Sequence, residues 1–442
     1  MIISLGRLRA FRPTRPCRAA AVTDSQPVLA GGHYPQMMLS TLPVGEPVPE
    51  DGSLPESALA GLAGETFGIY LHVPFCTTRC GYCDFNTYTA AELGDEPGAS
   101  RGTFIDSAVA ELDLAVRSLD PAPPAVSTVF IGGGTPTVLP PDHLGRFVGA
   151  VDQRFGLADD AEITTESNPE SVEAADLAEL VGQGFTRISF GMQSAVPHVL
   201  ATLDRVHSPG RPQQAVQEAR AAGFASTSLD LIYGAPGESL DDWRTSVEAA
   251  IATGPDHLSA YALIVEDGTR LAARIRRGEL PMPEEDDLAE KYLLADELLT
   301  QAGFTWYELS NWAHSPDHYC RHNLAYWRGG NWWGVGPGAH SHIGGTRWWN
   351  AKHPARYAAL LAAGRSPGQA RELLSAADRH TERVLLDVRL AEGLAIAELT
   401  TAERARVPDL AARDLVKHAG DQLTLTLPGR LLADAVVRDL LD

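Results

Sequence analysis

The sequence predicts an α/β fold followed by a small helical or winged-helix-like domain at the C-terminus. From residue 67 onward, short runs of β-branched and aromatic residues alternate with amphipathic helical stretches, and six such strand–helix units follow one another. Glycine-rich and polar motifs stand at or just after the strand ends, where parallel α/β folds bind their ligands. We therefore expect a parallel sheet that curls into a full or partial barrel.

The expected strands share β-branched or aromatic character over seven to nine residues: 67–73, 127–133, 161–167, 186–192, 226–234 and 257–263. Three of the intervening stretches have clear helical patterns, namely 104–119, 171–184 and 239–254. Within 171–184, apolar residues recur at helical spacing and Gly184 supplies a stop signal. These units predict the barrel.

Beyond residue 313 the periodicity fails, and residues 312–350 are expected to be loop-like, with many glycines, histidines and tryptophans. The last part carries a long helical pattern, then a short strand and a helix. The predicted divisions are a lead-in at 1–62, the barrel at 63–305, a Trp/His-rich connecting region at 306–369 and the C-terminal domain at 370–442.

The lead-in is rich in proline, glycine and alanine and is expected to be disordered. Its Arg-rich start resembles a transit peptide, but we favour an upstream start codon, with Met37 or Met38 as the true start. It has no long apolar region of the secretory type, and no stretch of the sequence approaches the ~18 apolar residues of a membrane span. We expect a cytoplasmic protein.

Composition excludes one class of partner. The chain has 36 Lys and Arg against 57 Asp and Glu, a formal net charge of -21. Nucleic-acid binding depends on cations that displace counterions from the phosphates, so we expect no nucleic-acid partner. Hydrophobic residues at 44% and charged residues at 21% are ordinary for a chain that buries a core.

Three of the five cysteines, Cys76, Cys80 and Cys83, form a C-x3-C-x2-C motif directly after the first expected strand. This is no disulfide framework, because such frameworks spread even numbers of cysteines along a secreted chain. Thiolates suit zinc or an iron–sulfur cluster, but a structural zinc site needs four ligands and no second pair follows. Three thiolates on a four-iron cluster would leave one iron open. Cys17 lies in the lead-in, and we assign it no role.

The cysteine motif, with Tyr82 before its last cysteine, resembles that of the radical S-adenosylmethionine (SAM) superfamily. Residues 132–136, Gly-Gly-Gly-Thr-Pro, resemble the family's loop that receives the methionine amino group. A glycine triplet lets a ligand approach the backbone closely. The resemblance implies a partial (β/α)6 TIM-type radical-SAM barrel with a [4Fe-4S] cluster and SAM.

A narrower resemblance, over about residues 67–442, is to the oxygen-independent coproporphyrinogen oxidase group, which holds both the dehydrogenases and the HemW-like heme chaperones. It rests on YLHVPFC (70–76), GGGTPT (132–137), TTESNPE (164–170), SFGMQS (189–194), LDRVHSP (203–209) and DLIYGAPGES (230–239). It implies that SAM is bound by Tyr70, Tyr82, Gly133, Gly134, Thr135, Glu166, Gln193, Arg205 and Asp230. Arg205 would bind the methionine carboxylate through two parallel hydrogen bonds. Glu166 and Asp230 would bind the ribose hydroxyls or the ammonium group of SAM. The alternative is a carboxylate–arginine network that fastens the strands together.

Two features favour the heme-chaperone branch. The dehydrogenase motif has a fourth cysteine two residues after the third, where this chain has Phe85. Residues 322–327 contain H-N-x-x-Y-W, which resembles the proposed heme-binding motif of that branch and implies a heme site at His322, Asn323, Tyr326 and Trp327, with Cys320 as a second candidate ligand.

The region around that motif is unusual in itself, because seven of eight tryptophans and five of fourteen histidines lie between residues 306 and 349. A porphyrin needs an aromatic wall and an axial imidazole or thiolate. The alternative is a Trp-rich cap on the barrel whose histidines are satisfied by hydrogen bonds.

The leading hypothesis is a heme chaperone that binds heme, a [4Fe-4S] cluster and SAM and passes heme to an unknown acceptor protein. Any membrane association would come through that acceptor. The second hypothesis is coproporphyrinogen III dehydrogenase, an enzyme of porphyrin biosynthesis. The third is another radical-SAM enzyme, such as a methyltransferase, on the same barrel.

Overall fold

Six parallel strands form the centre of the main sheet, as the alternating pattern predicted. In the computed structural model, residues 45–62, 65–93, 98–120, 123–205 and 207–442 are described. The six strands are β1 (Phe67–Val73), β2 (Val126–Gly133), β3 (Leu157–Ser167), β4 (Arg187–Gln193), β5 (Ser226–Tyr233) and β6 (His257–Ala262). They lie side by side in chain order, which is the arrangement of a partial barrel.

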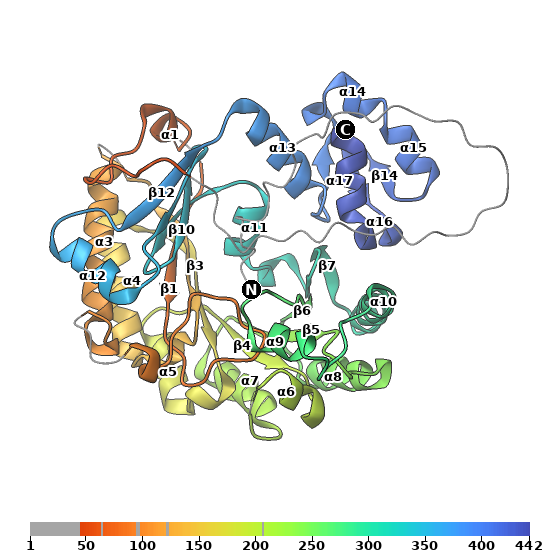
Figure 1. The fold of residues 1–442 in the computed structure, drawn as a ribbon, viewed down its shortest axis with the longest axis horizontal. Coiled ribbons are helices and arrows are strands. Elements are labelled where there is room, and N and C mark those ends of the chain that lie inside the picture. The colour runs from red at the N-terminus through yellow and green to blue at the C-terminus, as the bar shows by residue number, and fades with distance from the viewer. Residues whose placement is uncertain (1–44, 63–64, 94–97, 121–122, 206) are drawn as a thin grey trace.

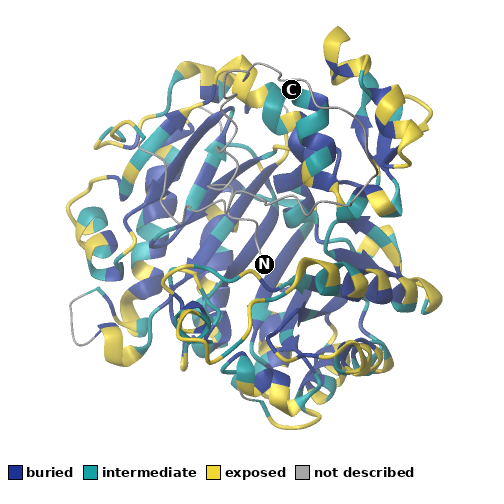
Figure 2. Cartoon of the chain, turned by 45° about the vertical axis from the view of Figure 1, so that its right-hand side comes forward, coloured by how far each residue is buried: buried dark blue, intermediate teal, exposed yellow. Residues whose placement is uncertain are grey.

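Helices cover the outer face of this sheet (Figure 1). They include α3 (Arg101–Ser118), α4 (Pro141–Phe155), α5 (Ala174–Gly182), α7 (Arg211–Ala222), α8 (Leu240–Thr253) and α10 (Glu285–Gln301). The short helices α6 (Pro197–Thr202) and α9 (Arg270–Arg276) instead share a separate apolar cluster with Ile232 of β5. In β1, Ile69 and Leu71 join one apolar core with Ile105 and Leu112 of α3. Figure 2 shows the strands buried in the middle of the molecule and the exposed residues on the outside of the helices.

The opposite face of the sheet, here called the inner face, is polar although it is buried. Because side chains alternate along a strand, the residues between the apolar core positions point to this face. The registers align Thr128, Glu162, Thr164, Glu166, Arg187, Ser189, Ser228, Asp230, His257, Ser259 and Tyr261 across it. Buried polar groups need partners, so an inner face of this kind is suited to hold polar ligands.

The region from 312 to 350, which the sequence led us to expect as a loop, instead extends the sheet. After α11 (Arg321–Trp327), strand β9 (Asn331–Val335) pairs in parallel with β1. Strands β10 (His340–Ile343), β11 (Thr346–Asn350) and β12 (Gly368–Leu373) follow in antiparallel order, with α12 (Pro354–Ala362) between the last two. The prediction was wrong because every residue of β9 and β11 is buried, so no polar alternation marks them as strands.

The other edge of the sheet carries β8 (Asn311–Ala313) and β7 (Thr305–Glu308), both antiparallel. Together these additions make twelve strands, so residues 306–369 belong to the same sheet as the barrel.

Residues 45–62 were expected within the disordered lead-in, but the structure packs them against the end of the sheet. Glu46 forms a β-bridge and an ion pair of 2.7 Å with Arg371 of β12. Ala58 of the short helix α1 (Glu56–Ala60) is fully buried. The expectation was wrong here because composition does not register contacts with distant strands. The predictions for residues 1–44, including Cys17, Met37 and Met38, lie outside the described residues.

The C-terminal region is a small sheet with helices, drawn in blue in Figure 1, as expected. It consists of α13 (Ala376–Asp387), β13 (Leu394–Ala395), α14 (Thr401–Arg404), α15 (Val407–Ala412), β14 (Val416–Ala419), β15 (Gln422–Leu425), α16 (Leu427–Leu431) and α17 (Ala433–Leu441). Its core is separate but includes Leu324 and Trp327 of α11. Arg430 ties it to the barrel through two hydrogen bonds to Asp296 and a position over the Trp306 ring. Among the helices the structure describes, none combines the length and apolar character needed to cross a membrane.

Candidate cofactor cleft and the Trp/His-rich segment

An open cleft with an empty volume of about 810 Å³ lies at the carboxyl ends of the central strands. The predicted residues that line it come from six separate segments: Cys76, Cys80, Tyr82, Cys83, Gly133, Gly134, Thr135, Glu166, Gln193, Arg205 and Asp230. Tyr70 is the one predicted SAM-binding residue that does not line it. The structure thus gathers nearly the whole predicted set in one place.

The cysteine motif forms the loop that follows β1. Its backbone is anchored where the amide of Cys76 donates to the carbonyl of Tyr88 at 3.0 Å. All three thiols are free. Burial raises the pKa of the Cys76 thiol, and it raises that of Cys83 to about 11. The burial of Cys76 and Cys83 fits a site completed by a positive metal group, which would draw their thiols to the thiolate form.

The arrangement does not suit a single metal ion. No group of three or more His, Cys, Asp or Glu side chains in the described residues is placed to hold one ion. In a four-iron cluster each thiolate binds a different iron, so the sulfurs lie farther apart than around a single ion. The three cysteines therefore fit a cluster better than zinc.

The glycine loop after β2 has no room for side chains. A Cβ on Gly134 would lie 2.9 Å from the Sγ of Cys76 and 2.5 Å from the carbonyl oxygen of Phe75. Gly133 has a φ of +111°, which other residues rarely adopt. Its amide donates to Glu166 at 3.1 Å. The loop is therefore held tightly against the cysteine loop and exposes backbone to the cleft.

Two carboxylates reach the cleft from the inner face. Burial raises the pKa of Glu166, and the nearby Asp230 carboxylate raises it further, while the Gly133 amide lowers it. Asp230 accepts a hydrogen bond of 2.8 Å from Ser189. Paired acids of this kind can accept hydrogen bonds from ribose hydroxyls or hold an ammonium group.

Gln193 ends β4 in a conformation that costs free energy. Its φ is +65°, in the left-handed region, and the register between β4 and β5 shifts at this point. Strained residues of this kind gather at ligand sites, where the surrounding structure holds them in place. The strain turns the Gln193 side chain into the cleft wall, which it lines.

Arg205 has hydrogen-bonding capacity left over. It donates to the Gly191 carbonyl at 2.9 Å and approaches the Sγ of Cys80 at 3.7 Å. Its Nε is buried and has no partner. A buried donor without an acceptor costs about 1–3 kcal/mol, and an anionic ligand would remove that cost.

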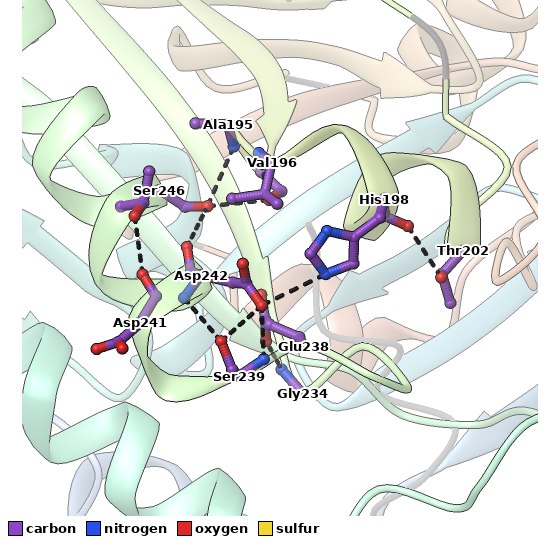
Figure 3. Close-up of polar contacts among 12 residues, drawn as sticks. Ala195, Val196, His198, Thr202, Gly234, Glu238, Ser239, Asp241, Asp242 and Ser246 are labelled. Carbon is purple, nitrogen blue, oxygen red and sulfur yellow. Dashed lines mark hydrogen bonds and ion pairs between the residues drawn. The ribbon is translucent and has the colours of Figure 1, made fainter.

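The loops behind these residues are fastened by the polar contacts of Figure 3. Ser246 of α8 accepts a hydrogen bond from the Ala195 amide at 3.1 Å, just after Gln193. After β5, Glu238 accepts from the Gly234 amide at 2.6 Å, and Ser239 caps α8 by accepting from Asp242. These contacts hold the ends of β4 and β5, and so the walls of the cleft.

The position where the dehydrogenase motif has its fourth cysteine also faces the cleft. Phe85 lines it and is 38% exposed, an unusual setting for a large aromatic side chain.

The next residue, Asn86, was missed by the sequence reasoning. Its side chain donates to the carbonyls of Pro337 at 2.9 Å and Lys352 at 2.8 Å. The cysteine loop is thereby fastened to the segment around β9–β11, and no local pattern could reveal this long-range contact.

Tyr70 lies deeper, on the inner face of β1. Its hydroxyl is 3.0 Å from the Nδ1 of His72, whose Nε2 in turn lies 2.9 Å from the carbonyl of Asn86. Burial raises the pKa of Tyr70, as does the Glu166 carboxylate. Tyr70 therefore lies below the cleft, between the cleft and α11.

Ser189 and Tyr261, which the sequence reasoning also missed, line the cleft itself. Their signal was the strand alternation that places both on the inner face.

The heme motif lies on α11, which is buried against the inner face near the amino ends of β1 and β2. His322 is 1% exposed and its two ring nitrogens are each 2.8 Å from a hydroxyl, those of Thr128 and Tyr326. Burial lowers its pKa to about 3. A Cβ on Gly68 would lie 2.7 Å from the hydroxyl of Thr128 and 3.2 Å from the His322 ring, so only glycine leaves the ring its place. His322 is thus a neutral imidazole with both nitrogens engaged.

The other residues of the motif are also packed into the fold, although the buried Nε1 of Trp327 has no hydrogen-bond partner among the described residues. Asn323 donates to Glu308 at 3.1 Å, and Trp327 joins the core of the C-terminal region. Cys320 is buried beside Glu162, and burial raises the pKa of its thiol to about 12. In this structure the motif plugs the barrel between its inner face and the C-terminal region.

Comparisons with known proteins agree with this fold and give the family. The model of the Radical SAM superfamily matches residues 70–250. The heme chaperone HemW of Mycobacterium tuberculosis is 56% identical over 383 residues, which cover 87% of this chain and 97% of the relative. HemW of Bacillus subtilis is 30% identical over 83% of this chain and 97% of its own. The chain belongs to the radical SAM superfamily and, within it, to the heme chaperone HemW family.

A solved structure shows the same fold. Coproporphyrinogen III oxidase of Escherichia coli, a radical SAM enzyme, superposes with a TM-score of 0.73 over 88% of this chain and 94% of its own. The two sequences are 22% identical. This likeness establishes the architecture, with its sheet of parallel strands.

Proposed function

We propose that this chain binds a [4Fe-4S] cluster, SAM and heme, and transfers heme to an acceptor protein. The observation that carries the proposal is the full-length relationship to the HemW chaperones, whose match spans 97% of the Mycobacterium tuberculosis relative. Phe85 in the cleft supports it, because the dehydrogenase motif places a cysteine there.

The cleft residues would hold the two cofactors. Cys76, Cys80 and Cys83 would bind three irons of the cluster, and the fourth would be open to SAM. Arg205 supplies an unpaired donor for the methionine carboxylate, and Glu166 and Asp230 supply acceptors. When bound, the cluster supplies electrons that the protein itself cannot provide.

The motif predicts a heme site at His322, Asn323, Tyr326 and Trp327, with Cys320 as the alternative ligand. Ligation by His322 would require its hydrogen bond to Thr128 or Tyr326 to break, since both nitrogens are engaged. A lost buried hydrogen bond costs about 1–3 kcal/mol, which iron ligation would have to offset.

The test is an anaerobic assay of the reconstituted protein with SAM, a reductant and coproporphyrinogen III, beside a hemin titration. We expect a Soret band on hemin addition, heme transfer to apo-acceptor and no protoporphyrinogen. A known coproporphyrinogen dehydrogenase serves as positive control. Protoporphyrinogen formation by this chain would replace the proposal with the enzyme, and the lack of any Soret band would end it.

A further inference from the structure

Among the histidines on the inner face of the sheet, one differs from the rest. His72, His257, His322 and His342 each have both ring nitrogens within hydrogen-bond distance of a partner. His340 lies two residues from His342 on β10 and therefore on the same face. Its ring makes no hydrogen bond in the part of the chain that the structure describes.

The surroundings of His340 fix its ring and place a cation nearby. Its ring stacks on that of Trp349, with centroids 6.0 Å apart and planes at 27°. The ring is partly buried, and burial lowers its pKa to about 4, an effect to which the nearby His72 and Lys352 add. It is therefore a neutral imidazole with its lone pair free. Lys352 is exposed, and its ammonium group can meet a carboxylate at the edge of a ligand.

A free metal ion does not fit this position. An ion needs several protein donors, and no cluster of three or more metal-binding side chains exists in the described residues. A porphyrin brings four nitrogen ligands of its own and needs one axial donor from the protein. An imidazole without a hydrogen-bond partner among the described residues, held by the Trp349 ring and close to a lysine, matches that requirement.

We propose that His340 is the axial ligand of the heme that this chain carries, with Trp349 holding its imidazole ring in place and Lys352 as the partner of a propionate. The assignment rests on the proposed function and deepens it. It also explains how α11 can be fully engaged in the fold of a heme-binding protein. The motif then acts indirectly: Tyr326 packs edge-on against Trp332, which contacts His342 beside the site.

The position also links the heme to the cofactor cleft. Asn86, three residues after Cys83, donates to the carbonyls of Pro337 and Lys352 on either side of His340 in the sequence. A Cβ on Gly338 would lie 2.6 Å from the Asn86 amide nitrogen, so the two loops are in close contact. Heme on His340 would therefore lie against the loop that carries the cluster cysteines.

The experiment is a hemin titration of the full-length, cluster-reconstituted protein, followed by its Soret band, with wild type, His340→Gly, His322→Ala and His418→Ala. His418 is exposed on the C-terminal region and serves as the matched control. We expect His340→Gly to lose the wild-type spectrum and to bind hemin roughly tenfold more weakly or worse. Added imidazole should restore the spectrum, because it can occupy the space of the missing ring.

The outcomes separate the ligand from the proposed function. A wild-type spectrum and affinity in His340→Gly overturn the assignment, as does loss of the spectrum that imidazole fails to restore. A folded His322→Ala variant that loses the wild-type spectrum and regains it with imidazole would show that the axial ligand is His322 of α11 and not His340. Absence of a Soret band in wild type would end the proposed function itself, whatever the variants show.

Discussion

The cofactor cleft and the His322–Asn323 pair of α11 hold polar side chains in different states. At the carboxyl ends of the strands, thiols are free, Arg205 keeps a buried donor unpaired, and Gln193 is strained. At the amino ends, His322 and Asn323 of α11 have partners within the protein. Unpaired groups and strain cost stability and persist where a ligand offsets them, whereas satisfied groups stabilise the fold. The comparison teaches that a motif's residue types alone do not distinguish a ligand site from a structural plug.

The largest effect is expected at the cluster cysteines. Cys83→Ala should abolish the cluster's absorbance and reduce the bound iron to background, because three thiolates are the fewest that leave only one iron open. The thermal unfolding midpoint of the apoprotein should change little, since Cys83 lies on a loop and is partly exposed. Iron analysis and absorption after anaerobic reconstitution measure this.

Cys320→Ala is the matched control for that experiment, since Cys320 is a buried thiol far from the cysteine loop in the sequence and outside the cleft lining. It should keep the cluster. Iron retained by Cys83→Ala, or lost in Cys320→Ala, would contradict the division of roles between the two ends.

An intermediate effect is expected at His322 of α11, near the amino ends of the strands. His322→Ala removes a fully buried ring and leaves the hydroxyls of Thr128 and Tyr326 without that partner. The free energy of unfolding should fall by about 2–4 kcal/mol, while iron content after reconstitution stays at the wild-type level. Urea unfolding and iron analysis together measure it. A variant as stable as wild type would mean that α11 is not the structural plug described here.

The smallest effect is expected on the pH dependence of stability, through a carboxyl group outside both the cofactor cleft and the heme motif. Glu111 of α3 is fully buried and accepts hydrogen bonds from Tyr357, Gly336 and Asn350, and so joins α3 to the strands that extend the sheet. Burial raises its pKa from 4.5 to about 7 despite those bonds. The folded protein thus keeps a proton that the unfolded chain releases, so this stability is present below about pH 4.5 and is lost as pH rises through 7.

The free energy of unfolding, measured by urea denaturation between pH 5 and 7.5, should therefore fall in wild type by about 2 kcal/mol from this group. Glu111→Gln should be flatter over that range, because glutamine does not titrate. Glu179→Gln, at an exposed position of α5, should keep the wild-type slope. Equal slopes in all three proteins would show that Glu111 does not titrate as described.

Much of the cofactor cleft was predictable because its signals are local. The run 67–73 is β-branched and aromatic, and the cysteine motif follows at once, so chain order alone brings both to one edge of a parallel sheet. The glycine triplet and Asp230 follow the same rule at later strands. Tyr70 did not join them, because it lies three residues before the end of β1, and each residue of a strand moves a side chain about 3.3 Å farther from the mouth of the cleft.

The sequence by itself determined the six central strands, their parallel order, the cysteine and glycine loops and the family to which the chain belongs, since each depends on neighbouring residues. Only the tertiary structure decided that 312–350 forms strands, that both nitrogens of His322 are engaged and that the ring of His340 is unpaired. Those properties depend on contacts between residues far apart in the chain, such as His322 with Thr128 and Asn86 with Lys352. Burial and pairing arise from such contacts, and no local pattern encodes them.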